Sequence, residues 1–297
     1  MLFPPENCPR IVVKIGSALL VDAAGGVRRA WLEGIAADIA ERVAAGQQVA
    51  VVSSGAIALG ARRLNLPKGG RASLEDAQAA AATGQIALGH TWAEVLAARG
   101  LTAAQILVTL DDLEDRRRYL NAAATLGRLL QLGVVPIINE NDSVATAEIR
   151  FGDNDRLAAR VAQAAGAQGV VLLSDIDGLY DRNPALPGAL HIARVERIDA
   201  GVAAMADTGS ASGMGSGGMV SKIQAARIAT GAGAALAIAS GRIDRPLSAE
   251  ARHTIFTPEK RKRARKAWLA GRLTAKGAIQ VDAGAAQALA AGRSLLA

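Results

Sequence analysis

Two turns that follow apolar runs contain the first residues whose types suggest chemistry. Lys14 interrupts an otherwise apolar run and is followed by Gly16-Ser17, and a second run ends in Ser53-Ser54-Gly55. A lysine beside glycine backbone N–H groups can hold a phosphate. A helix starting after the second turn would favour an anion at its N-terminus. Other interpretations stay open at this point: Lys14 could be an edge-strand lysine that reaches water, and Ser54 could be an ordinary helix cap.

Carboxylate and amide side chains gather in the middle of the chain. Asn139-Glu140-Asn141-Asp142 follows an apolar run, and Phe151-Gly152-Asp153-Asn154-Asp155 comes shortly afterwards. Seven carboxylates or amides within 17 residues exceed what a solvated turn requires, although a turn explains some of them. Ser174-Asp175 closes another apolar run, where a turn is again the alternative. Such groups suit the recognition of a small polar molecule.

A glycine-rich loop, GMGSGGMVSK, runs from Gly213 to Lys222 into a helical pattern. Its glycines fit G-x-G-x-x-G, but the preceding run DTGSAS is polar, and the dinucleotide-binding fingerprint requires a strand there. The sequence also lacks G-x-x-x-x-G-K-[ST], so a Walker loop is not expected. A flexible phosphate-binding loop ending in a lysine is the preferred interpretation, and an unstructured linker is the alternative.

Metal and cysteine chemistry have little support. The three histidines, His90, His191 and His253, show no metal-ligand spacing, and we assign them no role. Cys8 is the single cysteine, so no disulfide can form within the chain. We therefore expect no metal site built by the protein.

The elements that must position these residues alternate along the chain. Six apolar runs predict strands, and between them lie helical patterns. The strands are expected at Arg10–Ile15, Gln48–Val52, Leu101–Thr109, Val134–Ile138, Gly169–Leu173 and Gly233–Ala239. The helices include Trp31–Ala45, Leu74–Arg99 with a weak point at Gly84, and a segment near Ser221–Thr230. This alternation predicts an α/β fold with a mostly parallel sheet, whose ligands bind at the carboxyl ends of the strands.

Composition sets the class of protein. The 297 residues are 51% hydrophobic but only 3% aromatic, which fits helices packed on a Val/Ile-rich sheet and excludes disorder as the main state. The chain has neither a long uncharged apolar stretch nor a signal-peptide layout, so a cytoplasmic location without a membrane span is expected. The net charge of +7 resides in residues 258–276, which hold eight basic residues and Glu259. An RNA-associated protein is therefore an alternative class.

The ordered motifs KIGSALL, VVSSGAIALG, INENDSVATAEIRFGDNDRLAA, LLSDIDGLYDRNP and GSGGMVSKIQAA resemble the successive signatures of the amino acid kinase family. The resemblance runs from about Arg10 to Ser240. It implies a three-layer αβα sandwich with a central mostly parallel sheet. The pairing of NEND with FGDND is similar to members that use ATP to phosphorylate the side-chain carboxylate of L-glutamate, giving L-glutamyl 5-phosphate in the first step of proline biosynthesis. A kinase for another small acid, or an inactive regulatory relative, are the alternatives within the family.

The resemblance also implies roles for individual residues. Lys14 and Lys222 would be the catalytic cations, with Asp153 between them to orient both. The predicted substrate-binding residues are Ser54, Asn139, Asp142 and Asn154. The predicted ATP-binding residues are Lys14, Ser174, Asp175, Ser216, Gly217, Gly218, Met219, Val220, Ser221 and Lys222. Magnesium would arrive with ATP. Ser216 and Ser221 stand where the family more often has threonine, and both keep the hydroxyl.

The resemblance divides the chain into an amino acid kinase domain (1–257), a basic linker (258–276) and an incomplete PUA-like segment (277–297). That last segment is too short to form a core of its own. The resemblance further implies proline as a feedback inhibitor and a homo-oligomer, either dimer or tetramer. Neither a membrane nor a specific nucleic acid is expected as a partner.

Overall fold

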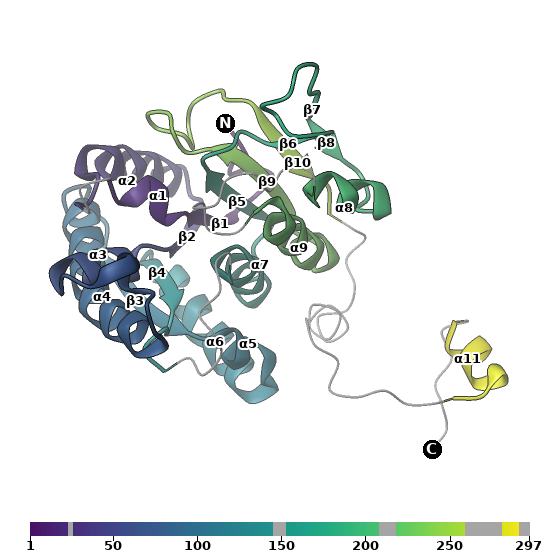
Figure 1. Ribbon diagram of the computed structural model, residues 1–297, viewed down its shortest axis with the longest axis horizontal. Coiled ribbons are helices and arrows are strands. Elements are labelled where there is room, and N and C mark those ends of the chain that lie inside the picture. The colour runs from purple at the N-terminus through teal and green to yellow at the C-terminus, as the bar shows by residue number, and fades with distance from the viewer. Residues whose placement is uncertain (23–25, 145–152, 208–217, 259–280, 291–297) are drawn as a thin grey trace.

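The computed structural model describes residues 1–22, 26–144, 153–207, 218–258 and 281–290, and its centre is one eight-stranded sheet (Figure 1). The strand order is β3-β4-β2-β1-β5-β9-β10-β8. The strands are β1 (Arg10–Ile15), β2 (Gln48–Ser53), β3 (Ala103–Val108), β4 (Val135–Glu140), β5 (Gly169–Ser174), β8 (Arg194–Val195), β9 (Ala235–Ser240) and β10 (His253–Phe256). All neighbours pair in parallel except β10, which runs antiparallel to β9.

Strand β1 lies between β2 and β5 and shows how the sheet separates two cores. Ile11, Val13 and Ile15 pack into the core on one face. Val12 packs into the core on the other face, and strand alternation places Lys14 on that same side. Because both faces are covered, these strands are apolar throughout instead of alternating with polar residues.

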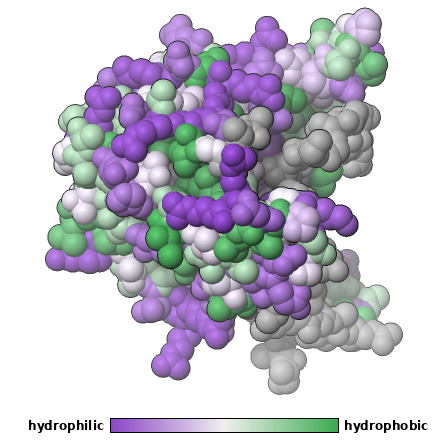
Figure 2. All heavy atoms as spheres, turned by 60° about the vertical axis from the view of Figure 1, so that its left-hand side comes forward, coloured by the Kyte–Doolittle hydropathy of each residue, from purple (hydrophilic) through white to green (hydrophobic). Residues whose placement is uncertain are grey.

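Helices cover both faces, which gives the predicted three-layer αβα sandwich (Figure 1). One layer contains α1 (Ser17–Leu20), α2 (Arg29–Ala44), α3 (Ala56–Arg63) and α4 (Leu74–Ala97). The other contains α5 (Leu110–Glu114), α6 (Arg116–Gln131), α7 (Asp153–Ala165), α8 (Ala200–Asp207) and α9 (Met219–Gly231). Figure 2 brings the side of α1–α4 forward, where hydrophobic residues form small patches among hydrophilic ones.

Helices α3 and α4 cross with their backbones in contact. A Cβ on Gly60 would lie 1.8 Å from the Ala80 carbonyl oxygen, and a Cβ on Gly84 would lie 1.8 Å from the Ala56 carbonyl oxygen. The weak point expected at Gly84 is therefore no break, because α4 continues through it. The two glycines instead let α3 approach α4 closely, and α3 starts directly after the Ser53-Ser54-Gly55 turn.

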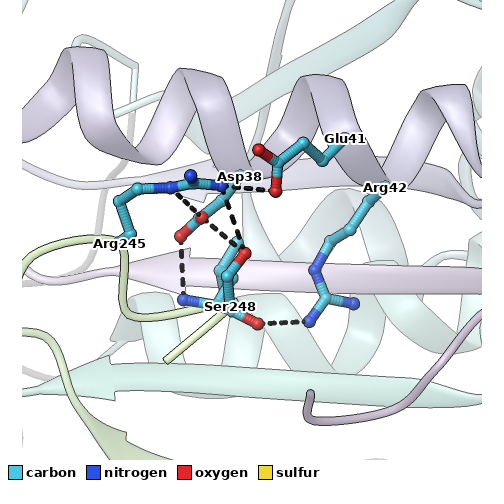
Figure 3. Close-up of polar contacts among 6 residues, drawn as sticks. Asp38, Glu41, Arg42, Arg245 and Ser248 are labelled. Carbon is cyan, nitrogen blue, oxygen red and sulfur yellow. Dashed lines mark hydrogen bonds and ion pairs between the residues drawn. The ribbon is translucent and has the colours of Figure 1, made fainter. Parts of the chain in front are cut away.

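A buried carboxylate on α2 holds the segment that follows β9 (Figure 3). Asp38 accepts hydrogen bonds from Arg245 Nε at 2.9 Å, Leu247 N at 3.0 Å and Ser248 Oγ at 2.6 Å. Arg42, one helical turn further along, donates to the Leu247 carbonyl oxygen at 2.7 Å. Asp38 is fully buried, so these bonds replace the water that it has lost.

The same segment is fixed at its start, close to the end of β5. Trp31 Nε1 donates to the Gly241 carbonyl oxygen at 2.8 Å, and Gly241 N donates to the Ser174 carbonyl oxygen at 2.7 Å. Helix α2 therefore anchors both ends of the stretch from Gly241 to Ser248. This stretch borders Ser174 and Asp175, two of the predicted ATP-binding residues.

The remaining described elements are small. They are the 3-10 helix η1 (Pro67–Gly70), a two-stranded sheet of β6 (Leu179–Tyr180) and β7 (His191–Ile192), and α11 (Ala283–Ala290). Asp282 Oδ1 accepts from Ala285 N at 2.7 Å and caps α11. The predicted basic linker falls, apart from Pro258, outside the described residues. Within the described ranges, no helix is both long and apolar enough to cross a membrane.

Candidate active site

Two lysine ammonium groups share one buried carboxylate at the carboxyl ends of the central strands. Lys14 Nζ lies 2.7 Å from Asp155 Oδ1, and Lys222 Nζ lies 2.9 Å from Asp155 Oδ2. Asp155 is fully buried, and each lysine is 5% exposed. The structure thus brings together the two lysines predicted as the catalytic cations, although 208 positions separate them in the sequence.

Three elements supply this arrangement. Lys14 lies on the face of β1 that carries α7 and α9, Asp155 lies in the first turn of α7, and Lys222 lies in the first turn of α9. The sequence-based assignment of Asp153 as the residue between the lysines is wrong, because Asp155 occupies that position. In the first turn of α7, the two oxygens of Asp155 reach both lysines.

Burial and charge act in opposite directions on these groups. Burial alone would raise the pKa of Asp155, but the ammonium groups of Lys14 and Lys222 together hold it below its ordinary value. Burial lowers the pKa of Lys14, and the nearby Lys222 lowers it further, while Asp155 opposes both effects. One carboxylate for two ammonium groups leaves an excess of positive charge, which suits an anionic ligand such as a phosphate.

Three of the four predicted substrate-binding residues meet beside this cluster. Asn154 Nδ2 donates to Ser54 Oγ at 2.7 Å and to Asn139 Oδ1 at 3.2 Å. Ser54 follows β2, Asn139 lies near the end of β4, and Asn154 precedes Asp155 on α7. Adjacent residues of α7 therefore join the lysine cluster to the amide-rich part of the site.

The fourth predicted residue, Asp142, follows β4 and is buried. Burial raises the pKa of Asp142 to about 6, although the positive charge of Arg71 opposes the rise. Burial also raises the pKa of Glu140 to about 7, and the charge of Asp142 adds to that effect. Two carboxyl groups whose charge changes near neutral pH thus lie at the end of β4.

The predicted ATP-binding residues are described in part. Ser174 Oγ donates to Asp175 Oδ1 at 3.1 Å, and Arg242 Nη2 lies 3.8 Å from Asp175 Oδ2. Gly218 caps α9, and Met219, Val220 and Ser221 form its first turn with Lys222. Ser221 Oγ donates to Asp155 Oδ2 at 3.4 Å. Ser216 and Gly217 lie outside the described residues.

Sequence reasoning missed functional candidates that the structure brings out. Asp155 belongs to the FGDND motif, but the motif alone does not show which aspartate faces the lysines. Gln85, on the Ala-rich α4, accepts a hydrogen bond from Asn139 Nδ2 at 2.9 Å, and no local pattern marks it. Among the described residues, no three His, Cys, Asp or Glu side chains form a group that could hold a metal ion.

Comparisons with known proteins bear on the family of this chain. The model of the Amino acid kinase family matches residues 9–240. Glutamate 5-kinase of Sphingopyxis alaskensis is 80% identical over all of this chain and 80% of its own length. Glutamate 5-kinase of Novosphingobium aromaticivorans is 66% identical over 98% of this chain and 78% of its own length.

Two solved structures show the same fold at low sequence identity. Carbamate kinase from Giardia lamblia bound to AMP-PNP superimposes with a TM-score of 0.59 at 14% identity, over 84% of this chain and 99% of its own. UMP kinase from Ureaplasma parvum gives a TM-score of 0.55 at 17% identity, over 84% of this chain and 98% of its own.

Proposed function

Because the chain belongs to the amino acid kinase family, we propose that it uses ATP to phosphorylate the side-chain carboxylate of L-glutamate. The product is L-glutamyl 5-phosphate, whose formation is the first step of proline biosynthesis. The observation that carries the proposal is the pair of ammonium groups on Asp155, with the Ser54–Asn154–Asn139 group beside it. The similarity to curated glutamate 5-kinases selects glutamate among small acids.

The reaction needs no general base. A glutamate side chain has a reference pKa of about 4.3, so the carboxylate is already the nucleophile at neutral pH. One of its oxygens forms a bond to the γ-phosphorus of ATP while the bond from that phosphorus to the β,γ-bridging oxygen breaks and ADP leaves. The obstacle is the repulsion between two anions, and catalysis rests on positioning and charge stabilisation.

Lys14 and Lys222 supply that stabilisation. Each ammonium group has one carboxylate oxygen of Asp155 to fix its place, so the two cations are positioned before the substrates arrive. As negative charge spreads over the oxygens of the transferring group, both cations offset it without reorganising. Asp155 is thus a positioning residue that acts through the two lysines.

The substrate-binding roles follow from charge. Asp142, when ionised, would pair with the α-ammonium of glutamate. Ser54, Asn139 and Asn154 would hold the polar groups of glutamate. Backbone N–H groups near Ser54 would bind one of its carboxylates. Asp153 stays a prediction as a site residue without the bridging role.

ATP would lie toward Ser174, Asp175 and the start of α9, with the loop that includes Ser216 and Gly217. Magnesium bound to the nucleotide phosphates would neutralise part of their charge, and no ligand set on the protein is proposed for it. A homo-oligomer, proline as a competing inhibitor and a cytoplasmic location stay predictions. So does the division into a kinase domain (1–257), a basic linker and a PUA-like segment.

An assay of ATP-dependent ADP release with a panel of small acids tests the proposal. The panel includes L-glutamate, L-aspartate, N-acetyl-L-glutamate, glutarate and carbamate, each at the same concentration. We expect turnover with L-glutamate to exceed turnover with every other acid. A higher rate with another acid would assign the chain to a different activity of the family.

A further inference from the structure

A row of side-chain amides extends from the edge strand β3 to the substrate side of the site. Gln85 Nε2 donates to Gln105 Oε1 at 3.3 Å, and Asn139 Nδ2 donates to Gln85 Oε1 at 2.9 Å. Asn154 continues the row by donating to Asn139 Oδ1 and to Ser54 Oγ. Asn154 donates to Asn139, Asn139 to Gln85 and Gln85 to Gln105, so all amide-to-amide hydrogen bonds of the row point toward β3.

Gln85 is the link that couples this row. An amide has an acceptor oxygen on one side and an NH2 donor on the other, and the two sides have nearly the same shape. Turning over Asn139 alone would set its oxygen against Gln85 Oε1 and its NH2 group against Asn154 Nδ2. Because Gln85 is only 8% exposed, water cannot readily compensate for such a mismatch. Asn139 therefore keeps its orientation as long as Gln85 presents its Oε1 to it.

The direction of the row decides what the site presents to a substrate. Ser54 Oγ accepts from Asn154, which leaves its own hydroxyl hydrogen to be donated elsewhere. Asn154 Oδ1 is buried and has no hydrogen-bond partner within the part of the chain that the structure describes. A buried acceptor of this kind needs a donor, which a bound ligand or an ordered water can supply. The row thus offers a donor that suits a carboxylate and an acceptor that suits an ammonium group.

We propose that Gln85 is a positioning residue for substrate recognition. By holding Asn139, it fixes which atom of Asn154 faces the substrate, and so favours an acid that also carries an ammonium group. Without Gln85, Asn139 and Asn154 can turn over, and the acceptor for the ammonium group becomes a second donor. This inference rests on the proposed use of glutamate. It adds a reason why the enzyme would prefer glutamate to glutarate, which has both carboxylates but no ammonium group.

Two substitutions at this position separate orientation from packing. Gln85→Met has a similar size but no acceptor, whereas Gln85→Glu keeps an acceptor for Asn139, and the exposed Gln105 can turn its NH2 group toward it. For Gln85→Met, we expect the preference for glutamate over glutarate in kcat/KM to fall about tenfold, from one misplaced buried hydrogen bond. The KM for ATP should change less than about twofold, and Gln85→Glu should keep the preference within about threefold of the wild type.

The outcomes are separable. The inference would be overturned if a folded Gln85→Met protein kept its preference, or lost kcat/KM equally for both acids. It would also be overturned if Gln85→Glu lost as much of the preference as Gln85→Met. If Gln85→Met does not fold, Gln105→Met takes its place. Because Gln105 is exposed, we expect this variant to lower the preference for glutamate over glutarate by only about threefold. An unchanged preference would count against the inference. A wild-type enzyme that does not use glutamate would instead refute the proposed function.

Discussion

Asp155 lies 2.7 Å from Lys14, with both side chains buried, and its second oxygen is paired with Lys222. This shared carboxylate differs from an ordinary buried salt bridge because the cluster of Lys14, Asp155 and Lys222 has one more positive charge than negative. Such an excess costs stability. It persists where a polyanion has to be bound and its charge stabilised during transfer.

Removing one of the two cations tests the catalytic role directly. For Lys222→Ala, we expect kcat to fall at least about a hundredfold, the effect of losing one transition-state charge contact. The fold should persist because Lys14 still pairs with Asp155. Arg227→Ala is the matched control, since Arg227 is exposed on the same helix, and its kcat should stay near that of the wild type. A Lys222→Ala enzyme with near-normal turnover would contradict the mechanism.

The pKa of Asp142 predicts a pH dependence for the use of glutamate. Only the ionised carboxylate pairs with an ammonium group, and burial raises the pKa of Asp142 to about 6. As pH falls through that value, kcat/KM for glutamate should decrease, by about tenfold at roughly one pH unit below the pKa. Asp142→Asn should show a low value without this step. A step of the same size in the Asn variant would show that another group is responsible.

The buried contacts of Asp38 predict a large loss of stability on its removal. Asp38→Ala leaves Leu247 N and the Arg245 guanidinium without their buried acceptor, so the free energy of unfolding should fall by about 3 kcal/mol. Glu41→Ala is the matched control, because Glu41 pairs with the same arginine at the exposed surface. Its loss should stay below about 1 kcal/mol. Urea unfolding of both variants measures the difference, and equal losses would show that the buried contacts of Asp38 add nothing.

The contact between α3 and α4 predicts opposite effects for two helical glycines. Gly84→Ala places a Cβ against the backbone of α3, and we expect a loss of at least about 2 kcal/mol from overpacking. Gly127→Ala, on α6, meets nothing within 4 Å and should gain about 0.5–1 kcal/mol from helix propensity. Thermal unfolding of the two variants should shift in opposite directions. A stabilised Gly84→Ala protein would mean that the helices are not in backbone contact.

Features that depend on neighbouring residues were predicted from the sequence, whereas contacts between residues far apart along the chain were not. The six parallel strands were predicted because each is a continuous apolar run, and the lysines because each stands at a glycine-bearing turn. The antiparallel β10 was not predicted, since its four residues HTIF show no strong pattern. Asp38 and Arg245 are 207 positions apart, so the sequence around either residue does not predict their contact.

The site was predicted less completely than the fold. The resemblance placed Asp153 of FGDND between the lysines, but the folded structure shows that Asp155 pairs with both. Gln85 could not be found from its neighbours, because it lies in an Ala-rich helix without a motif and only the fold brings it to Asn139. Gln85, which acts through Asn139, thus leaves no motif of its own.

Trapping the reaction product with hydroxylamine is the measurement that tests the central claim most directly. An acyl phosphate reacts with hydroxylamine to form a hydroxamate, and mass spectrometry shows which carboxylate has been converted. With ATP and L-glutamate, the wild-type protein should give the hydroxamate of the side-chain carboxylate. Omission of ATP should abolish the product, and Lys222→Ala should slow its formation at least about a hundredfold. A wild-type reaction that consumes ATP without forming a hydroxamate, or that forms it at the α-carboxylate, would contradict the account.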